Sequence, residues 1–363
     1  MRSGVTHLLA LAGEGRPAGG AAESRAREYC ADVLRELGFV VTEEVFQYSA
    51  FPGRLATPIA GAVLGASIVT SSLLVLRAAT VVAIAVLATG ALCTSLFARS
   101  MMRNGVLNAR WQRCQSINLA ARRGAAEPRV WLVAHLDSKS QPIPSAIRVA
   151  GVTLLVSALG LATLGLLMTL AGITSRTIEW IAIAAGVIGT LPVMASVVGE
   201  RSDGAVDNAS GVAAVLSAAA LVSRDVALGV LLPSAEELGL AGARAWVRQH
   251  TAGIALNCDG VDDDGALVIM YNQPAPARVI AAVQHAVRSA GTECGWARRM
   301  PLGLLTDSTA FAGAGWEAVT VSHGSLATLR RVHSASDSLA HLRGTSIGLV
   351  AHVLARAAEA LAT

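Results

Sequence analysis

Four long runs without a charged side chain constrain the fold of this chain more than any other feature. They span residues 55–76, 78–98, 149–175 and 180–199. A helix of about 20 apolar residues is long enough to cross a hydrocarbon core of about 30 Å. The runs form two pairs with very short connections, at Arg77 and at 175–177, which disfavours the alternative of four buried core helices. We therefore predict two transmembrane helical hairpins, 55–99 and 149–199.

The overall composition agrees with membrane segments. Hydrophobic residues make up 53% of the chain and charged residues 15%, whereas soluble domains have roughly 45–50% and about 25%. Glycines inside the four runs are expected to allow close contact between helices. These glycines are Gly61, Gly65, Gly90, Gly160, Gly165 and Gly186.

The orientation of the hairpins can be predicted from basic residues. Each hairpin begins and ends on the same side, so the rest of the chain is expected on one face of the membrane. The far turns carry only Arg77 and Arg176. The near face carries Arg54, Arg99, Arg103, Arg110, Arg113, Lys139, Arg148 and Arg201. The positive-inside rule then predicts a multi-pass protein of the cell membrane, embedded in the lipid bilayer, with its globular part in the cytoplasm.

Several other classes are disfavoured. The net charge is only +4, basic residues are scattered and aromatic residues are few, so no nucleic-acid partner is expected. The five cysteines include no CxxC pair, which argues against a disulfide framework or a structural zinc knuckle. The first apolar run is too short for a signal peptide. A transporter is disfavoured because the spans contain no ionisable residue except Glu179, near one end. The acidic run 262–264 is expected to be solvated.

The remaining segments alternate between helical and strand patterns. We expect helices at 21–37, 275–290 and 345–361, a helix opening at Asn208, and strands at 39–48, 116–122, 130–134, 226–233, 254–257, 266–270 and 317–322. Such alternation predicts an α/β fold, a mostly parallel mixed sheet sandwiched by helices. This catalytic domain would be discontinuous, formed by 1–50, 104–145 and 200–363.

Histidine and acidic residues adjoin apolar runs at five places. They are His135, Asp207, the Glu236–Glu237 pair, Asp259 and His333. In an open α/β sheet, ligand sites lie at the carboxyl ends of the strands. Oxygen and imidazole ligands suit borderline divalent metals, and two metals that share a carboxylate can activate a water. The pattern therefore indicates a two-metal hydrolase site.

The order of residues suggests roles within this site. Asp137 lies two residues after His135, so its carboxylate is expected to accept the imidazole N–H and to take part in catalysis. Glu236 and Glu237 are adjacent and cannot both face the same way, which suits one metal ligand and one general base. Asp207 precedes a helix of small residues and is either a helix N-cap or a carboxylate that bridges two metals.

The motifs EGRPAGG, AHLDS, GAVDNASGVA, SAEELGLAGA, NCDG, TDSTAF and HSASDSL follow one another in this order. In this run the chain resembles metallopeptidase family 28, the two-zinc aminopeptidases, over nearly everything outside the hairpins. The resemblance implies a zinc aminopeptidase-like fold and two zinc ions per chain. It implies that His135 and Asp259 hold one ion and that Glu237 and His333 hold the other.

By the same resemblance, Asp207 bridges the two ions and Glu236 is the general base. The implied reaction is hydrolysis of the first peptide bond of a peptide with a free N-terminus. Two positions depart from the family, which commonly has a histidine where Ser308 stands and an aromatic residue where Val332 stands. Neither is a predicted ligand, so the departures leave the activity in place and make the substrate preference uncertain.

Two alternative functions stay open, a single-zinc enzyme similar to glutaminyl cyclase and a non-catalytic membrane scaffold that keeps the peptidase fold. The ligands of both metals are present, which favours hydrolysis over the first. Loss of Glu236 or of a ligand would support the second, and none is lost. Because the second hairpin leaves the chain directly after the strand that leads into His135, we also expect the metal site at the membrane surface. Substrates with an apolar or membrane-associated N-terminal segment would then be favoured.

Overall fold

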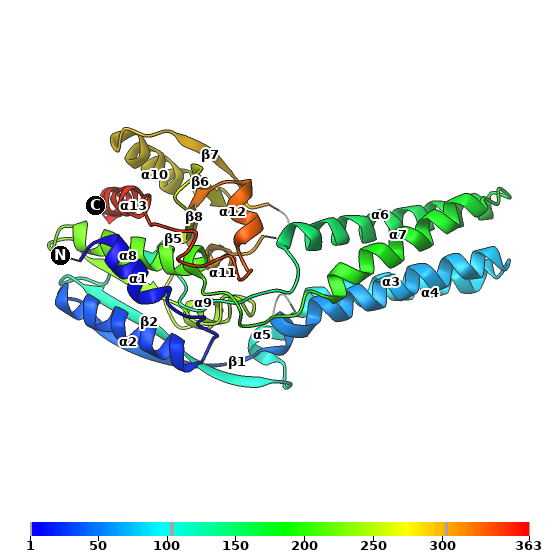
Figure 1. Ribbon diagram of the computed structural model, residues 1–363, viewed down its shortest axis with the longest axis horizontal. Helices are drawn as coiled ribbons and strands as arrows, with labels where there is room; N and C mark the ends of the chain where they lie inside the picture. Colours follow the sequence, from blue (N-terminus) through cyan, green and yellow to red (C-terminus); the bar gives the residue numbers. More distant parts are fainter. Residues whose placement is uncertain (1, 102–104, 302–303, 363) are drawn as a thin grey trace. The chain divides into compact units, whose positions relative to one another are not determined.

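The computed structural model of the protein describes residues 2–101, 105–301 and 304–362. The predicted limits at 1, 104 and 363 and the basic residue Arg103 lie outside the described residues. The chain forms two compact units, each assembled from segments separated in the sequence (Figure 1). The sheet unit comprises Met1–Tyr48, Gln112–Ser140 and Glu200–Thr363, and the helical unit comprises Ser49–Trp111 and Gln141–Gly199.

Eight strands of the described chain form one mixed sheet. They are β1 (Val40–Ser49), β2 (Arg113–Arg123), β3 (Val130–Val133), β4 (Leu228–Leu232), β5 (Ile254–Val261), β6 (Ala266–Tyr271), β7 (Cys294–Arg299) and β8 (Glu317–Gly324), in the spatial order β1-β2-β4-β3-β5-β8-β6-β7. The central neighbours β4, β3, β5 and β8 are parallel, and β2 and β6 pair antiparallel to β4 and β8. The predicted mixed α/β sheet is confirmed.

Helices cover both faces of this sheet, as Figure 1 shows. One face packs against α1 (Gly4–Leu11), α2 (Ala21–Glu36), α8 (Gly211–Leu221), α10 (Ala277–Ser289) and α13 (Ile347–Ala362). The other face packs against α9 (Ala241–Val247) and α11 (Asp307–Gly313). Successive side chains of β3 alternate between the two cores, with Leu132 in the first and Trp131 in the second. A strand buried on both faces is apolar throughout, which explains the sequence VWLV.

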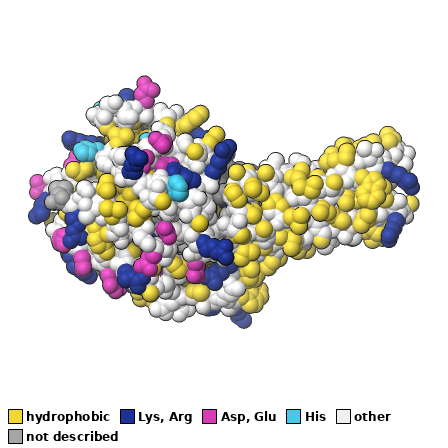
Figure 2. Space-filling model, viewed as in Figure 1, with side chains coloured by type: hydrophobic (Ala, Val, Ile, Leu, Met, Phe, Trp, Pro, Cys, Tyr) yellow, Lys and Arg dark blue, Asp and Glu magenta, His cyan; other side chains and the backbone are white. Residues whose placement is uncertain are grey.

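Four helices of the helical unit are long and apolar enough to cross a membrane. They are α3 (Thr57–Leu76), α4 (Thr80–Ser100), α6 (Ser145–Leu170) and α7 (Arg176–Met194). A short turn Pro52–Ala56 precedes α3, and α5 (Val106–Asn108) follows later in the unit. The four helices have mean hydropathies of 1.6–2.2, and Figure 2 shows hydrophobic side chains spread over the surface of this unit. Apolar side chains that face outward are expected of helices surrounded by lipid.

Close helix contacts within this unit are made at most of the predicted glycines. A side chain at Gly61, Gly65, Gly90 or Gly165 would collide with a neighbouring helix, and one at Gly186 would lie 3.2 Å from Ile68. The prediction was wrong for Gly160, which has no neighbour within 4 Å. Gly160 is exposed, whereas Leu155, Ala158 and Ala162 of the same helix are buried.

Elements that the sequence pattern did not indicate are short or exposed. These are α1, α9, α11, α12 (Leu326–Arg331) and β7. β7 is an exposed edge strand with the sequence CGWARR, so it lacks the apolar run that marks a buried strand. The helix expected to open at Asn208 begins instead at Gly211. Ala205–Ser210 forms an irregular turn in which Asp207 and Asn208 have non-helical backbone angles.

Candidate metal centre

The fold brings all the predicted metal ligands to one end of the central strands. His135 follows β3, Glu236 and Glu237 follow β4, and Asp259 lies in β5. These three strands are parallel neighbours, so their carboxyl ends meet at the same edge of the sheet. Asp259 sits where the register between β5 and β8 shifts, and such an irregularity re-aims a side chain.

Asp207 lies between the two histidines. Its Oδ1 is 3.1 Å from His135 Nε2, and its Oδ2 is 3.0 Å from His333 Nε2. The backbone of Asp207 is extended rather than helical, so the residue is not the N-cap of α8, whose first residue is Gly211. The sequence left Asp207 as either a helix N-cap or a carboxylate shared by two metals. The geometry fits the second alternative, because one oxygen faces His135 and the other faces His333.

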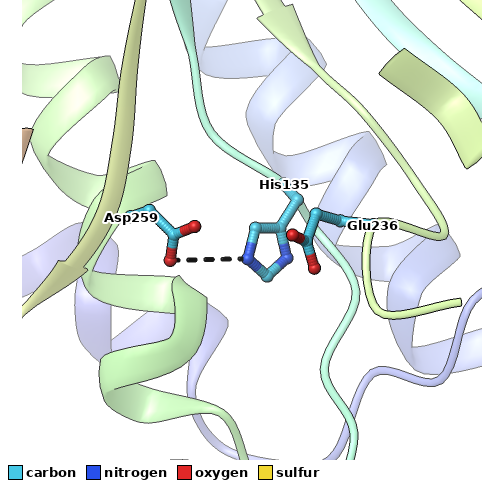
Figure 3. A group of neighbouring side chains, drawn as sticks. All are labelled: His135, Glu236 and Asp259. Atoms are coloured by element: carbon cyan, nitrogen blue, oxygen red, sulfur yellow. Dashed lines mark ion pairs between the residues drawn. The ribbon is translucent and has the colours of Figure 1, made fainter. Parts of the chain in front are cut away.

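The side chains fall into two groups around Asp207. Ligand atoms of His135, Glu236 and Asp259 lie within 4.8 Å of one another, and so do those of Asp207, Glu237 and His333. Figure 3 shows the first group, with the His135 ring between the two carboxylates and 3.9 Å from Asp259. Each group offers imidazole nitrogen and carboxylate oxygen, a donor set that fits zinc and other borderline divalent metals.

Adjacent Glu236 and Glu237 enter different groups, as expected from their order in the chain. Both main-chain amides donate to Asp137, Glu236 N to Oδ1 at 3.0 Å and Glu237 N to Oδ2 at 3.1 Å. The Asp137 carboxylate therefore fixes the turn that carries the glutamates.

The prediction that the Asp137 carboxylate accepts the His135 ring N–H differs from the structure. His135 Nδ1 lies 3.0 Å from the main-chain oxygen of Asp137 and 3.6 Å from its Oδ1. A separation of 3.6 Å is too long for a hydrogen bond. Since a carbonyl oxygen can only accept, the proton of the neutral ring is on Nδ1, and the lone pair of Nε2 faces Asp207 and Asp259.

Buried hydrogen bonds connect the loops of the site. Asn208 donates from Nδ2 to the Cys258 oxygen at 2.9 Å and accepts from Gly260 N at 3.1 Å, which joins the Asp207 turn to both sides of Asp259. Asp337 accepts the main-chain N–H of Val206 at 2.6 Å and that of Asp207 at 3.2 Å. These hydrogen bonds hold the turn that carries the Asp207 carboxylate.

Arg16, in the EGRPAGG motif, stabilises the segment before Asp207 through hydrogen bonds to main-chain oxygens. Its buried guanidinium donates to the main-chain oxygens of Leu11, Leu136, Asp203 and Gly204 at 2.6–3.0 Å. Gly204 has a φ of +59°, and a Cβ there would collide with Ser138. A glycine is therefore required at this point beside the ligand turn.

The carboxylates and imidazoles of the site shift one another's pKa values. Burial opposes the charge of His135, but Glu236 and the carboxylates around the ring outweigh it and raise its pKa well above the usual range. Burial would raise the pKa of Asp207, yet His135 and His333 hold it well below the usual range. Burial, with Glu237 and Asp307 adding and His135 opposing, raises the pKa of Glu236 well above its usual range. Cations at the two groups would relieve this repulsion among carboxylates.

The model for Peptidase family M28 matches residues 118–358, which is more than half of the chain. The chain belongs to this family. The match contains every predicted ligand, and it encloses α6 and α7, which lie between His135 and Asp207 in the chain. No curated protein matches the chain by sequence.

Solved structures share the fold of this M28 protein at low sequence identity. An aminopeptidase from Aneurinibacillus sp. strain AM-1 is 14% identical with a TM-score of 0.59, covering 98% of this chain and 92% of its own. A zinc aminopeptidase from Bacillus subtilis is 13% identical with a TM-score of 0.57, covering 98% and 93%. A glutaminyl cyclase from Porphyromonas gingivalis is 14% identical with a TM-score of 0.56, covering 98% and 96%. The recognition of the family from its motifs is confirmed.

The two departures from the M28 pattern differ in burial, since Ser308 is buried and Val332 is half-buried. The Ser308 hydroxyl is fully buried and lies 3.0 Å from the Thr306 hydroxyl and 2.7 Å from that of Thr320. Val332 packs against the larger core. The Ser308 side chain is therefore not free to contact a substrate directly, whereas Val332 is half-buried beside His333.

Three polar residues of the site were not recognised from the sequence. Lys139 lies 2.5 Å from Glu237 Oε2, and the only available signal was that it is the single lysine of the chain. Asp307 is fully buried, and neither carboxylate oxygen has a hydrogen-bond partner within the described chain. Burial raises its pKa to about 8, with His135 opposing and Asp137 adding. Its position in the TDSTAF motif was the signal for it.

The third is Asp262, and the expectation that the run 262–264 is simply solvated was wrong for Asp262 and Asp263, whereas Asp264 is exposed. Asp262 is 2% exposed, accepts from the Thr328 hydroxyl at 2.6 Å and pairs with Arg331. Asp263 accepts main-chain N–H groups of Arg343 and Thr345. Through Thr328 and Arg331, the Asp262 carboxylate stabilises the position of α12, the helix that precedes His333.

Proposed function

We propose that this M28 protein is a membrane-anchored, zinc-dependent aminopeptidase. The observation that carries the proposal is the position of Asp207, whose two oxygens each face one of two His- and carboxylate-containing groups. In this proposal His135 and Asp259 hold one zinc, Glu237 and His333 hold a second, and Asp207 bridges them. The two apolar hairpins, α3–α4 and α6–α7, would anchor the chain in the bilayer.

Zinc ions bound at these groups would supply Lewis-acid activation of a water and of the scissile carbonyl. Glu236 lies beside His135 and Asp259, and in this proposal its carboxylate takes the proton of that water. It would then deliver the proton to the leaving amine. The Asp137 carboxylate holds Glu236 through its main-chain amide, so Asp137 acts by positioning this base.

The substrate would be a peptide with a free N-terminus. The acidic cluster formed by Asp207, Glu236, Glu237 and Asp259 favours a cationic amine over a blocked one. The aminopeptidases of similar fold support the same substrate class. A preference for membrane-associated N-terminal segments follows from the proposed anchoring and can be tested by comparing soluble peptides with peptides anchored in bilayers.

A glutaminyl cyclase activity is the second candidate, because proteins of that name share the fold equally well. The two intact ligand groups around Asp207 favour the peptidase, since two metals suit hydrolysis with a shared water. Release of ammonia from N-terminal glutaminyl peptides would identify the cyclase. Release of a free amino acid would identify the peptidase.

Replacement of Glu236 tests the proposed mechanism. We expect Glu236→Gln to retain zinc but to lose at least about 100-fold in kcat on aminoacyl anilides, because a general base contributes about 10²–10⁴-fold. Asp264→Asn, at an exposed carboxylate after β5, is the matched control and should keep the wild-type kcat. A fully active Glu236→Gln variant would show that Glu236 is not the base.

A further inference from the structure

Lys139 is the single lysine of the chain and lies inside the candidate metal centre. It follows Asp137 by two residues, and its side chain is 14% exposed. Its Nζ is 2.5 Å from Oε2 of Glu237, whose side chain is 3% exposed. An ammonium that approaches a buried carboxylate so closely neutralises much of its charge.

The two oxygens of Glu237 therefore have different surroundings. Oε2 pairs with Lys139, whereas Oε1 has no hydrogen-bond partner within the described residues and lies 3.3 Å from His333 Nε2. Oε1 is thus the oxygen that Glu237 offers to the group it forms with Asp207 and His333. A metal at this position would share one carboxylate with a fixed ammonium, and the two cations would repel each other across a poorly solvated site.

The other position has no such competitor. Asp259 forms its ion pair with His135, at 3.9 Å, and the described part of the chain places no Lys or Arg ion pair on either residue. The two candidate metal positions therefore have the same donor types but differ in one respect, the ammonium that pairs with Glu237 at the second position.

We propose that Lys139 makes the two metal positions unequal, so that the position of His135 and Asp259 fills first and the position of Glu237 and His333 binds a metal more weakly. At limiting metal, the Lys139 ammonium supplies the positive charge beside Glu237. Occupancy of the second position, and with it the activity, then follows the concentration of free metal. This inference rests on the proposed two-metal function and adds a residue that tunes it.

The test is a calorimetric zinc titration of the full-length protein in detergent. Wild type is expected to bind two zinc ions in steps separated by at least about tenfold in Kd, and His333→Ala should lose the weaker step. Lys139→Met, which keeps an unbranched side chain without charge, should tighten the weaker step at least about tenfold. Lys139→Arg keeps the charge and should keep the separation of the two steps. Arg35→Met, at an exposed salt bridge, is the control for loss of a basic residue elsewhere.

An independent measurement uses wild type alone, because Lys139 is the single lysine. Its rate of labelling by an amine-reactive reagent, read by peptide mapping, should rise with the second zinc equivalent and not with the first. The reason is that zinc would then bind the Glu237 carboxylate and weaken its ion pair with the Lys139 ammonium.

Unchanged isotherms in Lys139→Met, or a weaker second step, would overturn the inference and show that Lys139 only orients Glu237. Two equal steps in wild type with retained hydrolysis would overturn the inference and leave the proposed function standing. Absence of zinc binding in every variant would overturn both.

Discussion

At the scale of single residues, the candidate centre depends on buried polar side chains that touch no predicted ligand. Glu23 in α2 is fully buried and accepts from Gly19 N at 2.6 Å and from the Ser116 hydroxyl at 3.4 Å. Ser116 in turn lies 2.6 Å from Ser234, two residues before Glu236. Burial, reinforced by Asp137, raises the pKa of Glu23 from its ordinary value of 4.5 to about 7.

We predict that Glu23 makes the unfolding free energy depend on pH. The folded protein holds the proton of Glu23 up to about pH 7, whereas the unfolded chain releases it near pH 4.5. The stability that this group contributes is therefore complete below about pH 4.5 and lost as the pH rises through 7. One pKa unit corresponds to about 1.4 kcal/mol, so the loss is at most about 3 kcal/mol.

Denaturation midpoints of metal-depleted protein, measured between pH 4.5 and 8, check this prediction. Glu23→Gln should flatten the curve, while Glu28→Gln, at an exposed position of α2, should leave it as in wild type. Equal slopes in all three proteins would contradict the assignment to Glu23.

Sequence patterns located the candidate ligands because each adjoins an apolar run, but they did not give the partners of these residues. Asp137 was expected to orient His135 and instead holds the amides of Glu236 and Glu237. Lys139 was counted only as a basic residue near a span. Such contacts join loops far apart in the chain, so no local spacing signals them.

At the scale of elements, helices α6 and α7 approach backbone to backbone. A Cβ at Gly189 in α7 would lie 2.9 Å from the Gly151 oxygen and 2.9 Å from Leu155 N, both in α6. Main-chain atoms cannot rotate away from such a contact, so the helices would have to separate. Gly160 in α6 has no neighbour within 4 Å and offers a matched comparison.

We predict that Gly189→Ala destabilises the second hairpin by about 1–3 kcal/mol, the usual cost of overpacking. Gly160→Ala should be neutral or stabilise by up to about 1 kcal/mol through helix propensity. Unfolding in mixtures of mild detergent and dodecyl sulfate, followed by circular dichroism, separates the two variants. Equal stabilities would show that the close approach at Gly189 is unimportant.

The elements were predictable where burial imposes a pattern on the sequence. β3 and β4 are apolar throughout, the four long helices carry charges only near their ends, and their positions agree with the predictions within a few residues. β7 was missed because an exposed edge strand has no such pattern. The start of α8 was misplaced because Asp207 and Asn208 have non-helical backbone angles and lie in the turn at the candidate site, before the helix.

At the scale of the whole molecule, the proposal requires the turns of both hairpins on the side of the membrane opposite to the sheet unit. Arg77 and Arg176 are the only basic residues near these turns, whereas the other ends carry many. We predict that a cysteine introduced as Thr174→Cys, in the exposed turn before α7, reacts with a membrane-impermeant maleimide in intact cells. The parent chain, which has five cysteines of its own, gives the background labelling. Labelling above this background only after permeabilisation would contradict the predicted orientation.

The central claim is that a zinc pair shared by Asp207 hydrolyses peptides at free N-termini. The most direct measurement compares zinc-loaded protein on a panel of aminoacyl anilides with the same compounds acetylated at the α-amine, with zinc per chain determined on the same sample. The account predicts two zinc ions per chain, hydrolysis of the free-amine compounds and none of the acetylated ones. Equal hydrolysis of both series, or two bound zinc ions without hydrolysis of either, would contradict it.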